Sequence, residues 1–440
     1  MNYRIKALTA LCSLIMAGAS AQDMKRLTLE EALQLGIANS KNLKIYDAKI
    51  VEAAAAIDEA KNKQLPDLNV SGSYLRLTNA NVNLRNAQQE QEGGASSAAF
   101  PNINQAAYGM ANFSLPLFAG GRIRFGIESA KYLLEAARLN GASDKNEIAF
   151  NITQAYVNLF KASQMVGVIR ENLAVSEKRD SDFLNMENNG IIARNDRLKA
   201  QLQTSDIELQ LLEAEHNLNI ATVNMDLLLG LPETTQLEVD TSFIGQQVDT
   251  KSFAEYEQLA LQNRHDVQAI QLQQQAAVLG TKAAKAENLP TIALTGGYVA
   301  ADIPKFLTLT NAVNAGVGIQ YNLANLWKSN AVLKQSRARE TQMAASEALL
   351  VDHIRLSVNQ DYQKAFLAKR KIEVYEKALT QATENYRITK NKFDNSLVTI
   401  TDLLDANVSL LSARINVVNA RADAALAYKK LLETTGTLFQ

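Results

Sequence analysis

Apolar side chains recur at alternating steps of three and four residues along two long stretches of the chain. In the first stretch these positions are Ile148, Ile152, Ala155, Leu159, Ala162, Val166, Ile169 and Leu173, and in the second they are Ile354, Val358, Asp361, Ala365, Ala368, Ile372, Tyr375 and Leu379. This spacing is the repeat of a left-handed coiled coil, with Asp361 as its one departure. No proline interrupts residues 117–231 or 305–440. The pattern predicts long helices, the first of which spans residues 120–188 and is about 100 Å long.

Each long helix is followed by a short polar stretch and then by a second helical pattern. Turns are predicted at ENNGIIAR, residues 187–194, and at DNSLVTI, residues 394–400. The return helix of the second pair has an apolar seam at Leu404, Val408, Leu411, Ile415, Val418, Ala422 and Ala425. Two antiparallel helices joined by a turn and sharing apolar seams form a coiled-coil arm. We therefore expect two such arms.

Four shorter stretches alternate apolar and polar residues with a period of two, which is typical of strands with one apolar face. Their apolar positions are Leu68, Val70 and Tyr74; Phe113, Leu115 and Leu117; Ile292, Leu294 and Tyr298; and Val313, Val317, Ile319, Tyr321 and Leu323. An open sheet edge leaves backbone groups without partners, so four strands alone cannot lie in lipid. Strands from other copies must complete the sheet. Three copies give twelve strands, an even number within the range of outer-membrane barrels, although other multiples of four are also compatible.

The chain is an internal duplication. At an offset of 224 residues, AKNKQLPDLNVSGSY aligns with AKAENLPTIALTGGY, and at an offset of 206 Tyr156, Asp196 and Gly230 align with Tyr362, Asp402 and Gly436. Each copy contains a helix, two strands and a long helical hairpin. The first helix is expected from Leu29 to about Gln64, with Thr28 and Glu31 as its capping box. We predict a signal peptide at 1–21, a first repeat at 22–230, a linker at 231–251 and a second repeat at 252–440.

The N-terminal 21 residues have the pattern of a secretory signal peptide. Arg4 and Lys6 form its basic start, an apolar run follows, and Ala19-Ser20-Ala21 is a small-residue cleavage site. Cys12 lies within the apolar run, so we expect no lipid on the mature N-terminus. No later window reaches the roughly 18 apolar residues of a membrane-spanning helix. Any membrane-embedded part would therefore consist of strands.

Composition excludes several function classes. The formal net charge is −1, from 45 basic and 46 acidic residues, without the surplus positive charge of a nucleic-acid-binding protein. Cys12 is the single cysteine, so neither a disulfide framework nor a zinc cluster can form. His216, His265 and His353 stand far apart in the sequence. We expect no catalytic residues, no metal site and no cofactor.

Several segments resemble the TolC family of outer-membrane efflux proteins. They are LTLEEALQLGIANSKNL, LPDLNVSGSY, LPLFAGGRIRFGIESAK and ITDLLDANVSLLSARINVVNARADAALAYKKLLETTG, and their order covers essentially the whole mature chain. The resemblance implies a mainly α protein with a small β part, forming a homotrimeric channel-tunnel. Four strands per chain would enter a 12-stranded transmembrane β-barrel in the outer-membrane lipid, and the helical hairpins would form an α-barrel across the periplasm.

The same resemblance implies a function and partners. Members of this family export drugs, toxins or other small molecules, in tripartite efflux or type I secretion systems. They dock a periplasmic adaptor protein and an inner-membrane transporter of RND, ABC or MFS type, and they are not enzymes. The alternatives are a stand-alone outer-membrane porin and a structural coiled-coil protein of the envelope.

A polar stripe runs along each return helix. In the second copy it comprises Asp402, Asp405, Ser409, Ser412, Asn416, Asn419 and Asp423, and in the first Asp196, Lys199, Gln203, Asp206, Gln210, Glu213 and Asn217. Any amphipathic helix has a polar face, so the stripe is either an outward solvated surface or the wet lining of a tunnel. An acidic lining would favour cationic permeants.

The stretch TITDLLDA, residues 399–406, contains two carboxylates at the predicted start of a helix. Thr399 could cap that helix, and acidic residues in the first turn stabilise the helix dipole. The resemblance further implies that Asp402 and Asp405 ring the periplasmic mouth, where six carboxylates in a trimer would raise each other's pKa. Asp196 would be the partner on the first arm.

The sequence departs from the family pattern near these aspartates. The tyrosine, arginine and turn glycine expected there are replaced by Phe393, Val398 and Ser396. We therefore expect closure of the mouth by packing and by other polar contacts. Phe118 and Trp327, near the strand-to-helix junctions of the two copies, are either membrane-interface or core aromatics.

Overall fold

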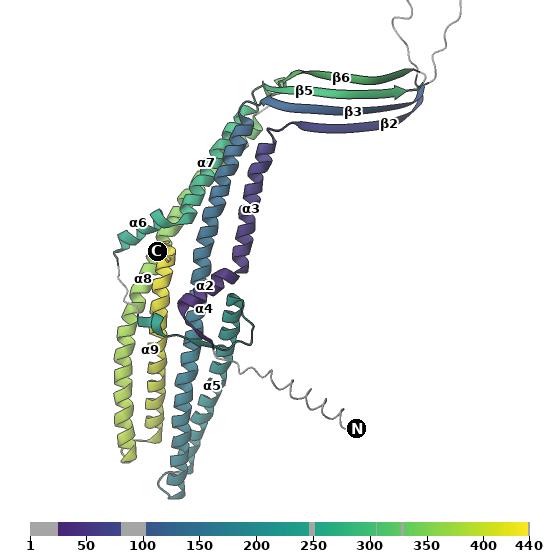
Figure 1. Ribbon diagram of the computed structural model, residues 1–440. Helices are drawn as coiled ribbons and strands as arrows, with labels where there is room; N and C mark the ends of the chain where they lie inside the picture. Colours follow the sequence, from purple (N-terminus) through teal and green to yellow (C-terminus); the bar gives the residue numbers. More distant parts are fainter. Residues whose placement is uncertain (1–24, 81–102, 246–250, 305, 327–329, 439–440) are drawn as a thin grey trace, which may run out of the picture. The chain divides into compact units, whose positions relative to one another are not determined.

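The computed structural model describes residues 25–80, 103–245, 251–304, 306–326 and 330–438 (Figure 1). The predicted signal peptide lies outside these residues. The chain forms two compact units, one from residues 1–48, 139–268 and 348–440 and the other from residues 49–138 and 269–347. We call them the helical unit and the sheet unit. Each unit takes segments from both repeats, so the duplication does not separate into two independent folds.

The sheet unit contains the four strands that the alternating patterns predict. They are β2 (Asp67–Ala80), β3 (Ile103–Phe118), β5 (Thr291–Ile303) and β6 (Leu307–Gln320). The sheet is antiparallel throughout, in the order β2-β3-β5-β6. The strand hairpins of the two repeats therefore pair through β3 and β5. Beyond β6 the chain forms the short helix η3 (Leu323–Leu326), so the last strand is shorter than the pattern predicted.

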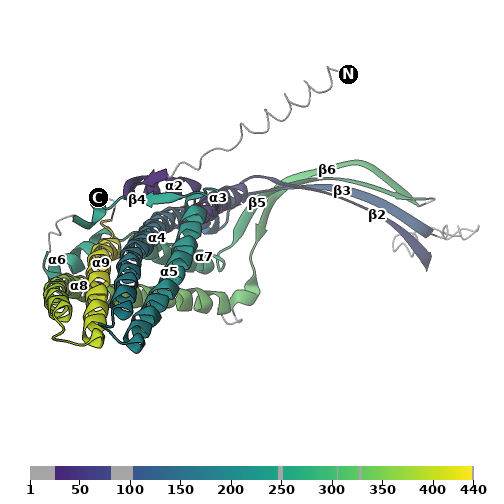
Figure 2. The ribbon, with the colours of Figure 1, turned by 90° about the horizontal axis from the view of Figure 1, so that it is seen from below.

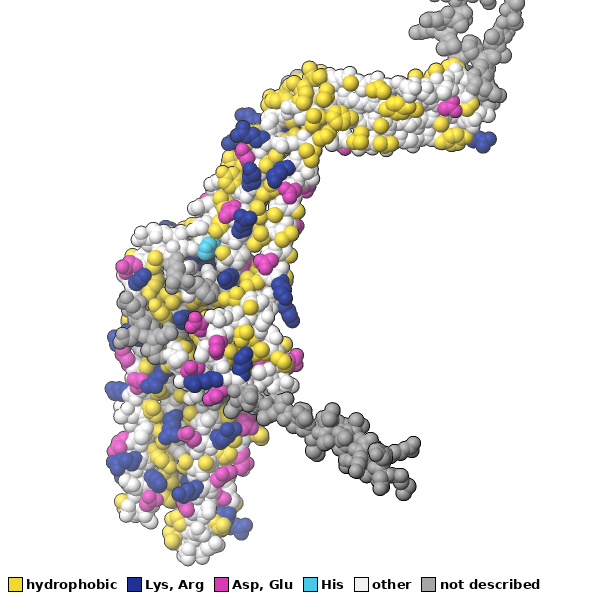
Figure 3. All heavy atoms as spheres, viewed as in Figure 1, with side chains coloured by type: hydrophobic (Ala, Val, Ile, Leu, Met, Phe, Trp, Pro, Cys, Tyr) yellow, Lys and Arg dark blue, Asp and Glu magenta, His cyan; other side chains and the backbone are white. Residues whose placement is uncertain are grey.

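One face of the sheet is apolar across all four strands. Val70, Ala111, Tyr298 and Val313 lie opposite one another in successive strands, and Val70 and Val313 are 74% and 75% exposed. In the space-filling view, hydrophobic side chains dominate the sheet, and charged side chains gather over the helices (Figure 3). An apolar face of this extent suits a non-aqueous neighbour.

A β-bulge shifts the register of β3 at its end. The register changes between Pro116 and Phe118, and Phe118 rather than Leu117 lies opposite Ile292. Pro116 has no N–H to donate to the neighbouring strand, so a bulge at this point sacrifices no hydrogen bond from that residue. Phe118 is 47% exposed and lies at the junction with the following helix. Its predicted counterpart Trp327 lies outside the described residues.

The first helix of each repeat is broken, whereas the sequence led us to expect one helix from Leu29 to Gln64. In the first repeat the structure has two helices, α2 (Leu29–Asn39) and α3 (Lys41–Asn62). The second repeat has the corresponding pair, α6 (Phe253–Asn263) and α7 (His265–Ala286). Ser40 interrupts the first pair because its backbone leaves the helical region, with ψ of 119°, and its hydroxyl accepts a bond from the Leu43 N–H at 3.3 Å. Serine competes for backbone groups in this way, which disfavours an uninterrupted helix. The predicted Thr28–Glu31 capping box is present.

The helical unit is built from the predicted arms. They are α4 (Arg122–Asn188) with α5 (Arg194–Leu229), and α8 (Ala331–Asp394) with α9 (Ile400–Thr434). Both ribbon views show the four helices side by side in the order α8, α9, α4, α5 (Figures 1 and 2). The predicted seam is buried at Ile152, Ala155, Leu159, Val166 and Ile169.

Asp361, the polar member of the second seam, has specific partners. It is 5% exposed. Its carboxylate accepts a bond from the Thr434 hydroxyl at 2.7 Å and lies 3.2 Å from the Lys364 ammonium. A buried carboxylate needs such partners to remain charged. The departure from the heptad therefore joins α8 to the end of α9.

The predicted linker contains regular structure. Strand β4 (Leu237–Val239) pairs in parallel with β1 (Lys25–Leu27), and the short helix η2 (Ser242–Gly245) follows. The buried Tyr156 hydroxyl lies 2.8 Å from the Leu27 carbonyl oxygen and 3.0 Å from that of Asp240. Its ring meets the Phe243 ring edge-on at 5.5 Å. The linker thus covers α4 with an extended segment and an aromatic side chain.

Candidate functional site: arm tips and polar stripe

Asp402 completes the capping box at the start of α9, in which Thr399 is the N-cap residue. Its carboxylate accepts from the Thr399 N–H at 2.9 Å and the Thr399 hydroxyl at 2.6 Å, and Thr399 Oγ1 accepts from the Asp402 N–H at 3.3 Å. The bonds from the Thr399 hydroxyl and N–H lower the pKa of Asp402. The capping interpretation of the sequence is therefore confirmed. The rise in pKa expected from a ring of carboxylates concerns several chains and stays a prediction.

The equivalent position of the first arm lacks this cap. Asp196 also occupies the first turn of α5, but Ala193 precedes the helix and has no side chain that can cap it. The Asp196 carboxylate instead lies 3.1 Å from Lys199 Nζ. Lys199 is the counterpart of Asp405, whose side chain is exposed. The two tips therefore present different charges at equivalent positions.

Packing joins the two tips within one chain. Phe393 on α8 meets Phe183 on α4 with ring centroids 5.5 Å apart. The surrounding cluster draws on all four long helices and comprises Phe183, Ala200, Ile400, Leu403 and Leu404, with Met186, Ile192, Tyr386 and Phe393 against it. A polar contact is added where Gln203 Nε2 donates to the Leu404 carbonyl oxygen at 3.4 Å. The tips of one chain are thus held largely by apolar contacts.

The turns of the two arms have the same backbone shape. Gly190 has φ of 70° and Ser396, at the equivalent position, has φ of 57°. Serine in this left-handed region is strained, whereas glycine is not. The next residues, Ile191 and Leu397, are 62% and 73% exposed. Each arm therefore ends in an uncovered aliphatic side chain.

On α9, the polar stripe lies between two buried seams. One seam contains Ala406, Leu410, Ala413 and Val417, and the other Leu404, Leu411 and Ala422. At about 100° per residue, the stripe lies roughly 100–120° from each seam. Leu431 continues the first seam and packs with Ile354 and Val358 of α8, and Ala422 in the second packs with Ile152 of α4. The stripe residues Asp402, Asp405, Ser409, Ser412 and Asn416 are exposed, and Asn419 is half-buried.

On α5, one of the two edges is uncovered. Ala200, Ile207 and Ala214 are buried, with Ile207 and Ala214 packed against Val166 and Ile169 of α4. On the opposite side, about 180° away, leucines are exposed. They include Leu202, Leu209 and Leu212, at 66%, 57% and 64%. The stripe residues Asp206, Gln210 and Glu213 are exposed and lie between these two edges.

Helix α8 has a corresponding uncovered edge. Leu349, Leu356, Leu367 and Val374 are 71%, 56%, 54% and 65% exposed, and they point about 150° away from the seam that packs on α9. Since α8 and α5 stand at the two ends of the row of helices, the row begins and ends with an exposed apolar edge.

The outer membrane efflux protein family matches residues 32–231 and 257–437 of the chain. The chain belongs to this family. It is accordingly an outer-membrane efflux protein that extends into the periplasm.

Individual relatives of this efflux protein are distant but extend over most of its length. The outer membrane protein TolC of Vibrio cholerae is 23% identical over 397 residues, covering 88% of this chain and 85% of the relative. The outer membrane efflux protein BepC of Brucella suis is 22% identical over 382 residues, covering 84% and 82%. The crystal structure of the outer membrane protein VceC of Vibrio cholerae shares the fold with a TM-score of 0.75 at 19% identity, covering 94% of this chain and 97% of that one.

The burial of two charged residues of the efflux protein was not predicted from its sequence. Arg179 on α4 is 8% exposed, and none of the described residues bonds to its Nη1 or Nη2. Asp226 near the end of α5 is 0% exposed, and neither carboxylate oxygen has a partner among the described residues. Burial lowers the pKa of Arg179 and raises that of Asp226 to about 6. The pattern of apolar and polar residues around Arg179 and Asp226 is the same as around exposed charged residues, so it gives no signal of their burial.

The described part of the efflux protein has no helix that is long and apolar enough to cross a membrane. Among the described residues, no three or more histidine, cysteine, aspartate or glutamate side chains gather as a metal site would require.

Proposed function

We propose that three copies of this chain close into one channel, with the polar stripes of α5 and α9 lining a tunnel. The observation that carries the proposal is the pair of uncovered apolar edges on α5 and α8. Because the two edges differ, one edge of each copy can pack against the other edge of the next copy, which is a head-to-tail interface. Such an interface forms a closed ring when the rotation from one copy to the next is a whole fraction of 360°. In that ring the edge of α5 meets the edge of α8 on the next copy.

The sheet supports the same arrangement. Strands β2 and β6 are its edges and carry unpaired backbone groups on their outer sides. Pairing β6 of one copy with β2 of the next leaves no free edge and gives twelve strands from three copies. The exposed apolar face would then contact the lipid of the outer membrane, with Phe118 near its boundary.

The stripe sets the character of the tunnel. On α5 and α9 the polar face lies between the two edges that pack against neighbouring helices, as the inward face of a helical barrel must. Asp206, Glu213 and Asp405 make the lining acidic, which favours cationic over anionic permeants. Asp402, Asp405, Asp196 and Phe393 would form the periplasmic gate.

Such a channel would transport its substrate and catalyse no reaction. We propose that it exports small molecules in a tripartite efflux or type I secretion system, as the names of relatives such as TolC and BepC suggest. The exposed Ile191 and Leu397 at the tips would contact a periplasmic adaptor, which joins the channel to an inner-membrane transporter of RND, ABC or MFS type. A porin working alone would instead show large resting conductance.

Thiol labelling during planar-bilayer recording tests the tunnel. Cys12 lies in the predicted signal peptide, so the mature chain would carry no competing thiol. Modification of Ser412→Cys by a charged methanethiosulfonate should reduce the current, because the reagent adds bulk and charge inside the pore. Lys377→Cys, exposed on a different face of α8, is the matched control and should show no change. Unchanged current through fully labelled Ser412→Cys protein would place the stripe outside the tunnel.

A further inference from the structure

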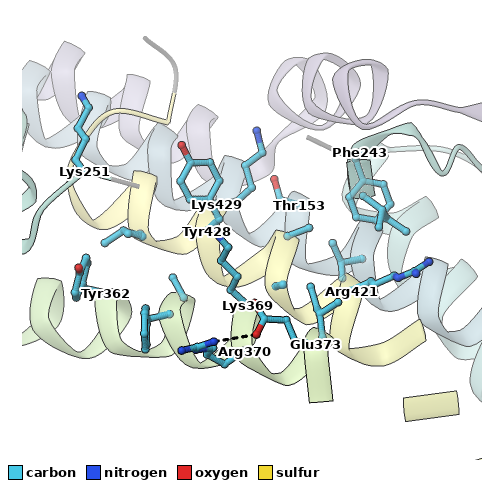
Figure 4. Close-up of a pocket in the computed structure, with 18 of the residues that line it drawn as sticks. Thr153, Phe243, Lys251, Tyr362, Lys369, Arg370, Glu373, Arg421, Tyr428 and Lys429 are labelled. Atoms are coloured by element: carbon cyan, nitrogen blue, oxygen red, sulfur yellow. Dashed lines mark hydrogen bonds and ion pairs between the residues drawn. The ribbon is translucent and has the colours of Figure 1, made fainter. Parts of the chain in front are cut away.

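We propose that a basic pocket of the helical unit binds an extended acidic peptide segment of a periplasmic partner protein. The pocket has a volume of about 1470 Å³ and is bounded by η2, the start of α6, α8 and α9, with contributions from α2 and α4. Figure 4 shows cationic side chains from the linker, α8 and α9 around it, together with Tyr362, Tyr428 and Phe243. Its lining shares no residue with the polar stripes or with the arm tips.

The internal duplication supplies a comparison for this pocket. Tyr362 and Phe366 on α8 are the counterparts of Tyr156 and Phe160 on α4, because 362 − 156 and 366 − 160 both equal 206. In the first repeat, these rings are 0% and 4% exposed and pack edge-on against Phe243, at 5.5 and 5.4 Å. In the second repeat Phe366 is 55% exposed. The Tyr362 ring is half-buried against Phe253 and Tyr256, with centroids 5.9 and 6.1 Å away. The surface that is covered in the first copy is thus open at Phe366 in the second.

The cover in the first repeat indicates what kind of occupant the surface accepts. Three segments lie over Tyr156: strand β1, the residue after β4, and helix η2. The Tyr156 hydroxyl donates to the carbonyl oxygens of Leu27 and Asp240, and its ring packs against that of Phe243. That cover is a polypeptide that is extended at β1 and beside β4 and carries one aromatic side chain on the short helix η2. We infer that the open surface at Phe366, beside the half-buried Tyr362, takes a polypeptide of similar shape supplied by another protein.

The charge of the pocket identifies the chemistry of that polypeptide. Its lining contains five cations, Lys251, Lys369, Arg370, Arg421 and Lys429, and one acid, Glu373. The first repeat has Ser163, Gln164, Glu215 and Val223 at the positions of the cations on α8 and α9. The basic character therefore belongs to the open copy alone, in a chain whose net charge is −1. Complementary charge selects an acidic partner and speeds its association.

Two of these cations are available for a partner. Arg370 lies 3.0 Å from Glu373, and Arg421 lies 2.7 Å from Glu376. For Lys369 and Lys429, no ion pair or hydrogen bond with another described residue is found. They come from different helices, α8 and α9, so carboxylates spaced along an extended segment could reach both. Phe366, beside them, offers an apolar contact.

The pocket would remain accessible in the proposed channel, and this step alone rests on the proposed function. On α9, Arg421 and Tyr428 lie about 150° round the helix from the polar stripe. On α8, Tyr362 and Glu373 lie about 120° from the apolar edge at Leu367 and Val374. The pocket therefore faces neither the tunnel nor the neighbouring copy, but the outside of the helical barrel.

Peptide binding to the full mature protein in detergent micelles tests the proposal. The probe is a fluorescein-labelled Glu-Glu-Phe-Glu-Glu peptide, followed by anisotropy at low and high salt. We expect binding that weakens with salt. Lys369→Glu combined with Lys429→Glu should weaken it at least tenfold, and Phe366→Ala should weaken it less. Lys390→Glu, an exposed reversal elsewhere on α8, should bind as the original protein does.

Other outcomes would overturn the proposal. Equal binding by the double reversal variant, with an unchanged circular-dichroism melt, would show that the acidic peptide binds elsewhere. Full competition by citrate at the peptide's own concentration would indicate a site for small anions. Equal binding of Lys-Lys-Phe-Lys-Lys would show that charge does not select the ligand. The assay needs no conduction, so a failed tunnel and a failed pocket give different results.

Discussion

At the scale of single residues, Asp402 and Asp405 have different roles although they lie in the same helical turn and a half. Asp402 is held by three hydrogen bonds to Thr399 at the start of α9. Asp405 is exposed, and its backbone carbonyl accepts from the Ser409 hydroxyl at 2.9 Å. A carboxylate committed to a cap stabilises its helix, whereas an uncommitted one is free to act on ions. Both carboxylates contribute charge to the proposed gate, but only that of Asp405 is not engaged in the cap.

Separate substitution of the two aspartates should give opposite results. Asp402→Ala removes the capping box, so we expect a melting temperature lower by a few degrees in circular dichroism. Asp405→Ala should leave that temperature unchanged and reduce the cation preference of single channels several-fold, because it removes three carboxylates from the proposed ring. Glu177→Ala, an exposed acid on α4 outside both polar stripes, serves as the control for general loss of charge. Unchanged selectivity in Asp405→Ala would exclude a ring that acts on permeating ions.

Sequence reasoning identified residues whose position follows a pattern and missed those that depend on the neighbouring helix. Thr28, Glu31, Thr399 and Asp402 could be predicted because a capping box is local in sequence. The burial of Asp226 could not, because it depends on what packs against the end of α5. A carboxyl whose pKa rises from 3.8 to about 6 costs the folded state up to roughly 3 kcal/mol at neutral pH.

At the scale of elements, long periodic segments were predicted well and short ones were not. Sustained heptads located both arms, and period-two alternation located all four long strands. The strands β1 and β4 have three residues each, too few to show a period, and they pair across more than 200 residues of sequence. The break at Ser40 was missed because the apolar pattern continues through it. A single backbone bond to Ser40 Oγ outweighs that pattern.

The ends of the return helices provide a test at this scale. Gly230 and Gly436 both have φ of 70°, and an added Cβ would lie 2.9 Å from Asn39 Cβ at the first and 3.2 Å from the Asn263 backbone at the second. Alanine at either position should destabilise the fold by about 1–3 kcal/mol, since it strains the backbone and displaces a neighbour. Gly167→Ala, within α4 and with nothing nearby, should stabilise by about 0.5–1 kcal/mol. Thermal unfolding of the three variants measures both signs, and equal melting temperatures would contradict this account of the helix ends.

At the scale of the whole molecule, the two repeats keep their contacts while exchanging charges. Arg170 on α4 lies 2.7 Å from Glu215 on α5, and Glu376 on α8 lies 2.7 Å from Arg421 on α9. Both members shift by the same offset, since 376 − 170 and 421 − 215 equal 206. This ion pair therefore occupies the same place in both hairpins, with its two charges reversed in sign. Two such hairpins form a row whose ends differ, as a head-to-tail ring of copies requires.

The exposed edge of α5 is where this arrangement of copies can be tested. Leu209→Asp with Leu212→Asp would place carboxylates in an interface that the proposal buries, at a cost that few subunit contacts can offset. We expect the mature protein to elute as a monomer in size-exclusion chromatography with light scattering, instead of as a trimer. Gln210→Asp, on the adjoining polar stripe, adds a carboxylate that would face the tunnel and should leave the trimer intact. Because both leucines are more than half exposed in the single chain, their loss should not unfold the hairpin, and circular dichroism of the monomer would verify this. A trimer that persists in the double variant would mean that the copies meet through another face.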